Sequence, residues 1–350
     1  RAIVRQVGGT IAVTTLFVRG QYGSDLEIAF NILGGLGRNP NVAAVLLIGL
    51  DEQFTEEVAR RIRPSGKAVE AVLLQPRGTI HAIEQGTRRA LSLVRRASNG
   101  RRRTCPVAAL TVGVECGGSD TTSGLTCNPV IGRLSDRVVD QGGTVIISET
   151  TEFLGAEHLF AARAVSAELG RKFTEMVLRA EQVAMSQGMD IRGTNPSPDN
   201  IRGGLTTIEE KALGAMAKAG TRPLSGVLSC GGSAAGKGLH FLDAPAPAVE
   251  NLTSFAAAGC QLILFGTGVG NPIGNMVATT IKVSGNVHTL AEMADNMDFD
   301  ASDVIEKGAS VAAVGDRLYA FALEVASGTR TASEVLDVRE TAISRFGPTI

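Results

Sequence analysis

Short, uninterrupted apolar runs alternate with amphipathic segments along this chain. Runs of aliphatic and β-branched residues are typical of strands buried on both faces of a sheet, and they predict strands over residues 11–18, 42–50, 68–74, 107–114, 143–147, 261–265 and 279–283. Apolar residues that recur every three or four positions predict helices over residues 24–33, 56–62, 79–98, 129–141, 205–219, 318–327 and 334–344, with 156–184 mostly helical. Strands that alternate with helices in this way indicate a mainly parallel, helix-covered sheet.

Glycine, proline and capping residues set the expected ends of these elements. Ser24 or Asp25 is expected to cap the helix that follows, and Gly34-Gly35-Leu36-Gly37 is expected to end it. Thr206-Thr207 predicts another capped helix start. Residues 188–204 contain two prolines in a polar stretch and are predicted to be a loop.

A basic, glycine-containing break over residues 95–104 divides the chain. It holds Arg95-Arg96, Asn99-Gly100 and Arg101-Arg102-Arg103, and we interpret it as a solvated linker, with a phosphate contact as the alternative. The predicted fold class is therefore α/β, with a smaller N-terminal parallel α/β domain over residues 1–104 and a larger C-terminal α/β domain over residues 105–350.

Composition narrows the class of protein. The chain has 350 residues, of which 44% are apolar, and this is enough for a large core. The net charge is −1, with no Trp and two Tyr, so we expect neither charge-driven binding to nucleic acid or a membrane nor base stacking. No apolar stretch reaches membrane-spanning length. Five Cys without a Cys-x-x-Cys pair suit a reducing compartment, so a cytoplasmic location is expected.

Clusters of polar residues follow several predicted strands. The longest is Val114-Glu115-Cys116-Gly117-Gly118-Ser119-Asp120-Thr121-Thr122-Ser123-Gly124, and others are Ser148-Glu149-Thr150, Gly155-Ala156-Glu157-His158 and Gly266-Thr267-Gly268-Val269-Gly270-Asn271-Pro272. Carboxylates, a thiol, an imidazole and hydroxyls at glycine-rich strand ends are typical of an enzyme active site rather than of a core.

Four of these residues could hold a divalent metal ion: Cys116, Glu149, Glu157 and His158. Carboxylate and imidazole groups are the ligands that hard or borderline metals prefer, and a thiolate can join them. Adjacent side chains diverge on a regular helix, so Glu157 and His158 share a site only at a helix start or in a loop, which Gly155 permits. The alternatives are a local cap or salt bridge for His158 and a small buried residue for Cys116.

Polar side chains of three segments are predicted to bind a substrate: Ser119, Asp120, Thr121 and Thr122, then Asn195, Ser197 and Asn200, and finally Thr267, Gly268 and Asn271. For the first segment the alternative is a turn that caps the next helix. The last segment lacks the Lys-Ser/Thr of a phosphate-binding loop, so it is expected to hold a carboxylate or to be a plain turn. Lys282 is a candidate carboxylate ligand or base, with a surface lysine as the alternative, whereas Lys211 is expected to form a helix-surface ion pair.

The motifs CGGSD, SETTEFLGAEH, NPSPDNIRGGLTTIEEKALG and KVSGN resemble those of the altronate/galactarate dehydratase family, in its large catalytic part. The resemblance implies removal of a leaving group β to a carboxylate, which gives a 2-keto acid. It also implies a divalent metal, with iron or manganese favoured and magnesium a further candidate. The family's small N-terminal β-rich domain has no counterpart in this sequence, so a small β-rich domain or subunit is an expected partner.

The chain departs from the dehydratase pattern at three thiol positions. It has Arg19-Gly20-Gln21-Tyr22-Gly23 where altronate dehydratases carry Gly-Cys-Gly, Leu50-Asp51-Glu52 in place of Gly-Cys-Glu, and Gly274-Asn275 near a Gly-Cys pair. In these respects it is similar to the large subunit of sulfolactate sulfo-lyase, a branch of the same family.

The sequence therefore predicts a metal-dependent lyase that dehydrates a sugar acid such as altronate or galactarate to a 2-keto-3-deoxy acid. Glu149, His158 and Lys282 are the expected catalytic residues, and the metal is expected to hold the enediolate. The first alternative is the large subunit of a sulfolactate sulfo-lyase, which releases sulfite and gives pyruvate. The second is a non-catalytic acid-binding protein. A small hydroxy acid is the expected ligand, and a homo-oligomer the expected assembly.

Overall fold

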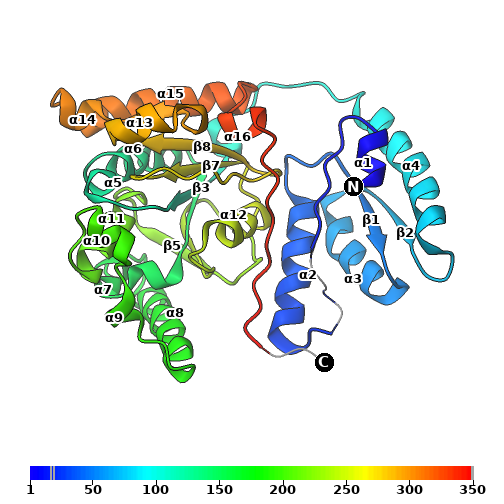
Figure 1. Ribbon diagram of the computed structural model, residues 1–350, viewed down its shortest axis with the longest axis horizontal. Helices are drawn as coiled ribbons and strands as arrows, with labels where there is room; N and C mark the ends of the chain where they lie inside the picture. Colours follow the sequence, from blue (N-terminus) through cyan, green and yellow to red (C-terminus); the bar gives the residue numbers. More distant parts are fainter. Residues whose placement is uncertain (16–17, 19, 348–350) are drawn as a thin grey trace.

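The computed structural model describes residues 1–15, 18 and 20–347, and its chain forms two lobes (Figure 1). The N-terminal lobe contains a two-stranded parallel sheet of β1 (Ala44–Gly49) and β2 (Ala68–Leu73). Its helices are α1 (Ala2–Gln6), α2 (Gly23–Arg38), α3 (Glu52–Ile62) and α4 (Gly78–Ala97). Helix α2 faces the other lobe and packs against α12 (Ala248–Ala257).

The C-terminal lobe is built on a seven-stranded sheet in the order β5-β6-β4-β3-β7-β8-β9. In that order the strands are β5 (Leu224–Leu228), β6 (Gly238–Leu242), β4 (Thr144–Ile147), β3 (Thr111–Cys116), β7 (Leu262–Gly266), β8 (Thr279–Ser284) and β9 (Phe299–Asp300). All of their pairings are parallel. The predicted α/β class, with a smaller N-terminal and a larger C-terminal part, is confirmed, whereas the proposed division at residue 104 stays a prediction.

Helices cover both faces of this sheet, as a parallel sheet requires. Val112 and Val114 of β3 face a core shared with α6 (Cys127–Asp140) and α15 (Val311–Ser327). Ile146 and Ile263 of the neighbouring strands face a second core with α12 and α2. The remaining helices are α5 (Thr121–Leu125), α7 (Glu157–Ala161), α8 (Ala167–Ser186), α9 (Ile191–Thr194), α10 (Pro198–Arg202), α11 (Ile208–Ala217), α13 (Val287–Glu292), α14 (Asp303–Glu306) and α16 (Ala332–Val335).

The glycine-rich stretch of α2 does not end the helix, so that prediction was wrong. A Cβ on Gly35 would lie 2.3 Å from the Ala257 carbonyl oxygen of α12, and one on Gly37 would lie 2.4 Å from Ile62 Cδ1 of α3. The glycines therefore allow α2 to approach both neighbouring helices closely. The predicted cap is also wrong, because Tyr22 is the N-cap residue and makes no side-chain capping bond.

The remaining differences between the predicted and the observed elements lie in segments where the apolar periodicity is weak. Residues 10–15 form no strand, and residues 16 and 17 of the predicted strand lie outside the described part of the chain. The helix expected over residues 334–344 is limited to α16, after which the chain runs irregularly along the junction of the lobes (Figure 1). Residues 188–204 contain two short helices, α9 and α10, rather than loop alone. β5, β6 and α12 were not predicted, and glycines at 226, 231, 232, 236 and 238 interrupt the apolar pattern around the two strands.

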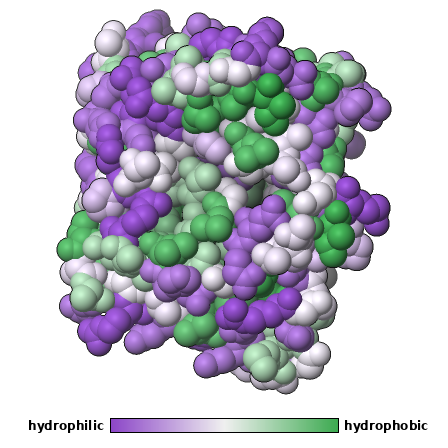
Figure 2. Space-filling view, turned by 90° about the vertical axis from the view of Figure 1, so that its left-hand side faces the viewer, coloured by the Kyte–Doolittle hydropathy of each residue, from purple (hydrophilic) through white to green (hydrophobic). Residues whose placement is uncertain are grey.

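The carboxyl ends of the central strands all lie at one edge of the sheet, because the strands are parallel. The Cys116 segment after β3, the Glu149 segment after β4 and the Asn286 segment after β8 meet at this edge. Figure 2 views the molecule from the left-hand side of Figure 1, where α5 and α10 lie, and its surface there mixes hydrophilic and hydrophobic side chains. Within the described ranges, no helix combines the length and the apolar character needed to cross a membrane.

Candidate active site

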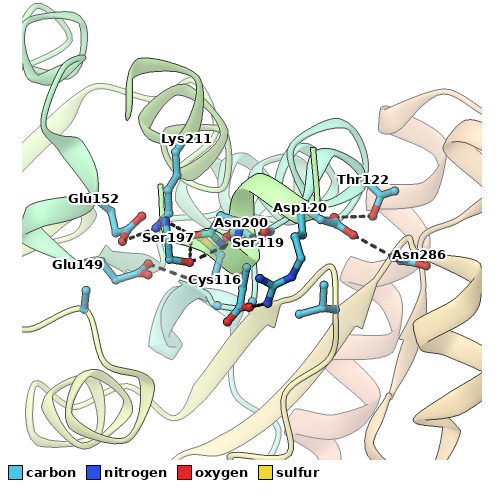
Figure 3. A pocket seen from close by; sticks show the side chains of 17 residues that line it. Cys116, Ser119, Asp120, Thr122, Glu149, Glu152, Ser197, Asn200, Lys211 and Asn286 are labelled. Carbon is cyan, nitrogen blue, oxygen red and sulfur yellow. Dashed lines mark hydrogen bonds and ion pairs between the residues drawn. The ribbon is translucent and has the colours of Figure 1, made fainter. Parts of the chain in front are cut away.

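A cavity of about 840 Å³ opens at the carboxyl edge of the large sheet. Its walls come from the segments after β3, β4 and β8 and from the α10 and α11 region (Figure 3). The lining residues are Cys116, Gly117, Gly118, Ser119, Asp120, Thr122, Glu149, Glu152, Ser197, Asp199, Asn200, Arg202, Gly203, Lys211, Ala246, Val269 and Asn286. This volume lies in the range of small-molecule binding sites.

One buried ammonium group joins two residues of the cavity floor. Lys218, the C-cap residue of α11, donates from Nζ to Cys116 Sγ at 2.9 Å and to Glu149 Oε2. The Cys116 backbone N–H also donates to Glu149 Oε2, at 3.3 Å. Lys218 is fully buried and the Glu149 side chain is 2% exposed. We call these three residues the Lys218 cluster.

Burial dominates the electrostatics of the cluster. It raises the pKa of Glu149 to about 7, with the positive charge of Lys218 opposing the shift. It raises the pKa of the Cys116 thiol to about 12, and the charge of Glu149 adds to that effect. Burial alone would lower the pKa of Lys218, but Cys116 and Glu149 favour the ammonium by more, so its pKa is raised. At neutral pH the cluster therefore holds an ammonium, a thiol and a carboxyl group near its titration midpoint.

The backbone of Glu149 is strained, which is common at functional sites. Its φ of 72° and ψ of 64° lie in the left-handed region, at a cost of about 1–3 kcal/mol for a non-glycine residue. Neighbouring backbone bonds hold it there, from Glu152 N to the Glu149 carbonyl at 2.8 Å and from Thr150 N to the Ala244 carbonyl at 3.2 Å. Among the described residues none donates to Glu149 Oε1, the carboxylate oxygen that Lys218 leaves free.

Glu115 lies directly before Cys116 and is fully buried. Its Oε2 accepts from Asn251 Nδ2 of α12, and its Oε1 has no hydrogen-bond partner within the described residues. Burial, reinforced by the negative charge of Glu149, raises the pKa of Glu115 well above its usual range. Burial therefore favours the neutral form of Glu115, and of these two acids it is Glu149 that lines the cavity.

Lys211 lies in the cavity wall and not on the helix surface as predicted. Its Nζ donates to Glu152 Oε1 at 3.1 Å (Figure 3). It also donates to Asn195 Oδ1 at 2.8 Å. Lys211 and Lys218 are seven residues apart, which is about two helical turns, so both lysines project from one face of the α11 segment. That spacing was visible in the sequence, but the burial of this face was not, and Lys218 and Glu152 were missed.

Five of the predicted substrate-binding residues line the cavity: Ser119, Asp120, Thr122, Ser197 and Asn200. Asp120 Oδ1 caps α5 by accepting from Ser123 N at 2.8 Å, and its Oδ2 accepts from Asn286 Nδ2 at 2.9 Å. Ser197 and Asn200 form the capping box of α10. These side chains are thus helix caps and cavity walls at once, and the local caps fix their positions.

The other predicted substrate-binding residues lie outside the lining. Asn195 is held by Lys211, and Thr121 Oγ1 donates to the Gly203 carbonyl at 3.2 Å. In the loop after β7, Thr267 Oγ1 accepts from Gly270 N at 3.0 Å, and Asn271 Oδ1 accepts from Ile273 N at 2.9 Å.

That loop is not an anion-binding nest. The N–H groups of Gly268 and Val269 both donate to the Gly118 carbonyl, each at 3.0 Å. A Cβ on Gly268 would lie 2.1 Å from the Asp120 carboxyl group. The loop therefore supports the Asp120 wall, and Val269 is its residue in the cavity lining.

Lys282 is not a cavity residue, which corrects its prediction as a base or carboxylate ligand. Its side chain is fully buried, and Nζ donates to the carbonyls of Pro272 at 2.9 Å and Ile273 at 3.3 Å. Lys282 occupies an interior position of β8, and its ammonium group binds the loop that contains Pro272 and Ile273 rather than a ligand in the cavity.

The predicted metal ligands do not converge. Glu157 Oε2 accepts from Gly155 N at 2.7 Å in a local turn, and His158 lines a separate hollow beside Arg171 of α8. Cys116 and Glu149 do meet, but they share the ammonium of Lys218. In the described part of the chain, no three His, Cys, Asp or Glu side chains group so as to hold a metal ion. The residues present do not fit the predicted metal centre.

Comparison with known proteins identifies the family. Residues 2–98 match the family model of the D-galactarate dehydratase/altronate hydrolase second domain, and residues 107–349 match the D-galactarate/altronate dehydratase C-terminal model. The chain belongs to the D-galactarate/altronate dehydratase family. The expected family resemblance is confirmed.

Three curated relatives differ in the reaction that their names give. The (2R)-sulfolactate sulfo-lyase subunit beta of Chromohalobacter salexigens is 38% identical over 347 residues, covering 99% of this chain and 89% of that subunit. The altronate dehydratase of Bacillus subtilis is 33% identical over 331 residues, 94% of this chain and 66% of the relative. The galactarate dehydratase (L-threo-forming) of Escherichia coli is 38% identical over 229 residues, 65% of this chain and 44% of the relative. Dehydratases and sulfo-lyases are both lyases, so this family member is a lyase.

Proposed function

We propose that this chain catalyses β-elimination from a small 2-hydroxy carboxylate, with Glu149 as the catalytic base. One observation carries the proposal: Glu149 lines the cavity, Lys218 anchors one of its oxygens, and no group in the described part of the chain donates to the other. Burial brings its pKa to about 7, and a base works best when its pKa is near the working pH.

The reaction follows from the groups in the cavity. Lys211, a cationic residue of the cavity lining, binds the substrate carboxylate through its ammonium. Glu149 Oε1 takes the proton from C2, and the electron pair forms an enediolate. The enediolate then expels the group on C3, as the sulfite anion or as water when Glu149 returns its proton to the departing hydroxyl oxygen. The resulting enol tautomerises to a 2-keto acid. No step passes through a metal ion, because the predicted ligands do not converge.

A sugar acid is the first candidate substrate, with water as the leaving group. The cavity is about 840 Å³ and carries hydroxyl, amide and carboxylate side chains on several walls. Ser119, Asn200 and Asn286 face it from three different segments, which suits a chain of hydroxyl groups. Altronate and galactarate are the acids that the names of the dehydratase relatives suggest.

Sulfolactate is the second candidate, with sulfite as the leaving group. The observation that favours it is coverage: the alignment with the sulfo-lyase subunit includes 99% of this chain and 89% of the relative, whereas the altronate dehydratase of B. subtilis is covered to 66%. Sulfite departs as an anion and needs no proton at the moment of cleavage, unlike a hydroxyl group. The word "subunit" in that relative's name supports a partner subunit for this chain.

A direct assay separates these substrates. The purified chain is incubated with altronate, galactarate or (2R)-sulfolactate, and both 2-keto acid and sulfite are measured. We expect 2-keto acid from one class of acid, and a loss of about 1,000-fold in kcat for Glu149→Gln, in line with the removal of a catalytic base. Calorimetric binding of an acid without any product would instead favour a non-catalytic acid-binding protein.

A further inference from the structure

Two of the residues predicted to bind a metal ion are already held by a cation of the protein. Lys218 Nζ donates to Cys116 Sγ at 2.9 Å and also to Glu149 Oε2. A metal ion bound by this sulfur and this oxygen would occupy the space that the ammonium group fills. The Lys218 side chain has no exposed surface, so its ammonium group is not solvated by bulk water.

Contacts with α6 hold the backbone of Lys218 in place. Ser135 Oγ of α6 donates to the Lys218 carbonyl at 2.8 Å, and α11 packs along α6. The ammonium thus approaches the cluster from the helix side of the sheet, while Cys116 and Glu149 come from the ends of β3 and β4. Three segments distant in sequence therefore meet at the ammonium group of Lys218.

We infer that Lys218, and not a metal ion, is the cation that fixes Cys116 and Glu149, and that Lys218 is a positioning residue for the base. The first half of this inference stands on the contacts alone. The second half rests on the proposed function. Lys218 and the Cys116 N–H both bind Oε2 of Glu149, and this two-point anchor leaves Oε1 for the substrate. Without the ammonium, the carboxylate would be held by one backbone donor and its orientation would be lost.

Cobalt titration tests the first half without any need for turnover. Co²⁺ bound to a thiolate gives an intense charge-transfer absorption, so the probe reports directly on Cys116. We expect Co²⁺ titrations of the reduced wild-type chain to be indistinguishable from those of Cys116→Ser and Glu149→Gln in this absorption. A stoichiometric band in the wild type that either substitution abolishes would overturn the inference.

Steady-state kinetics test the second half. We expect Lys218→Met to lower kcat by about 100-fold, the lower range for loss of base function, with KM changed less than about threefold. Lys218→Arg, which keeps a positive charge, is expected to restore part of kcat. Lys211→Met is the matched control from the same helix face, and it is expected to raise KM because Lys211 binds the substrate carboxylate.

The outcomes separate the inference from the proposed function. A wild-type chain without turnover on any of the acids would count against the proposed function, while the cobalt titration would still decide which cation holds the cluster. A Lys218→Met variant with wild-type kcat would overturn the positioning role. If Lys218→Met does not fold, Lys218→Arg decides the kinetic question: a kcat reduced less than that of Glu149→Gln, at unchanged KM, supports the role, and an unchanged kcat overturns it.

Discussion

At the scale of single residues, the candidate site depends on the different surroundings of two neighbouring buried acids, Glu115 and Glu149. Glu115 and Glu149 both lie at strand ends and both are buried, yet Glu149 contacts Lys218 and the cavity, whereas Glu115 contacts Asn251. A carboxyl group without a cation is protonated when buried, while one beside an ammonium titrates closer to neutrality. The two acids therefore differ in their partners, and Glu149 is the one that lines the cavity.

The pH dependence of turnover should report the titration of Glu149. A base acts when deprotonated, so kcat/KM is expected to rise with pH and level off above about 7, where the pKa of Glu149 lies. The measurement is kcat/KM from pH 5 to pH 9 in a constant-ionic-strength buffer. An activity already maximal at pH 5 would contradict the assignment of Glu149 as the base.

The stability of the fold should depend on the same carboxyl group, with the sign set by its raised pKa. The unfolded chain loses the Glu149 proton near the usual value of 4.5 and the folded chain near 7, so the folded state binds more protons between these values. The free energy of unfolding is therefore expected to fall as pH rises from 4.5 to 7. Glu149→Gln should flatten this slope in urea unfolding measured at both pH values, and an identical slope in the variant would exclude a titrating Glu149.

Glu115→Gln should be tolerated, because glutamine has the shape and neutrality of protonated glutamate. We expect the free energy of unfolding at pH 7 to change by less than about 1 kcal/mol, as measured by urea unfolding. Glu115→Lys serves as the contrast, since it places an unpaired charge at a fully buried position and is expected to prevent folding. A large loss of stability in Glu115→Gln would mean that Glu115 is ionised.

At the scale of elements, helix packing explains glycines that the local sequence pattern would assign to a helix end. Gly34, Gly35 and Gly37 resemble a helix end in the sequence, but they lie inside α2. Their lack of a side chain lets α2 reach α12 and α3. The same reasoning holds for Gly268, whose missing Cβ leaves space for Asp120 at the cavity wall. Helix propensity is a weak guide where two backbones approach each other this closely.

Gly35→Ala is expected to destabilise the protein, although alanine is the better helix former. The new Cβ would lie 2.3 Å from the Ala257 carbonyl oxygen, and overpacking of this kind costs about 1–3 kcal/mol. Thermal unfolding should show a lower Tm for this variant. Gly8→Ala is the control, because nothing lies within 4 Å of its added Cβ. A higher Tm for Gly35→Ala would show that α2 does not pack on α12 in this way.

At the scale of the whole molecule, the C-terminal segment connects the two lobes. After α16 the chain runs along their junction, and Phe346 and Gly347 lie beside α2 (Figure 1). Ala342 N donates to Thr253 Oγ1 of α12 at 3.3 Å, and the N–H groups of Phe346 and Gly347 donate to the carboxylate of Asp25 in α2. The carboxylate of Asp25, which was one of the two predicted caps of α2, thus binds residues 346 and 347 instead.

Asp25→Ala should release this segment. The buried carboxylate accepts from Gly347 N at 2.8 Å and from Phe346 N at 3.1 Å, and bonds to charged groups contribute about 1.5–3 kcal/mol each. We expect faster proteolytic cleavage between residues 336 and 347 and faster amide hydrogen exchange there. Asp199→Ala is the control, since Asp199 pairs with Arg202 on the surface. Unchanged exchange in Asp25→Ala would show that other contacts hold the segment.

Local sequence pattern was enough to predict the alternating α/β order, most strand and helix positions, and the polar segments that meet at the sheet edge. These features depend on local periodicity and on parallel strand order, which neighbouring residues encode. Which of the polar side chains face the cavity depends on the folded arrangement of the chain. That arrangement placed Lys211 and Lys218 in the site and His158 and Lys282 outside it, because burial and partners come from segments far apart in the sequence. It also gave Cys116 and Glu149 an ammonium as their shared cation, a contact between residues about 70 to 100 positions apart that no local pattern predicts.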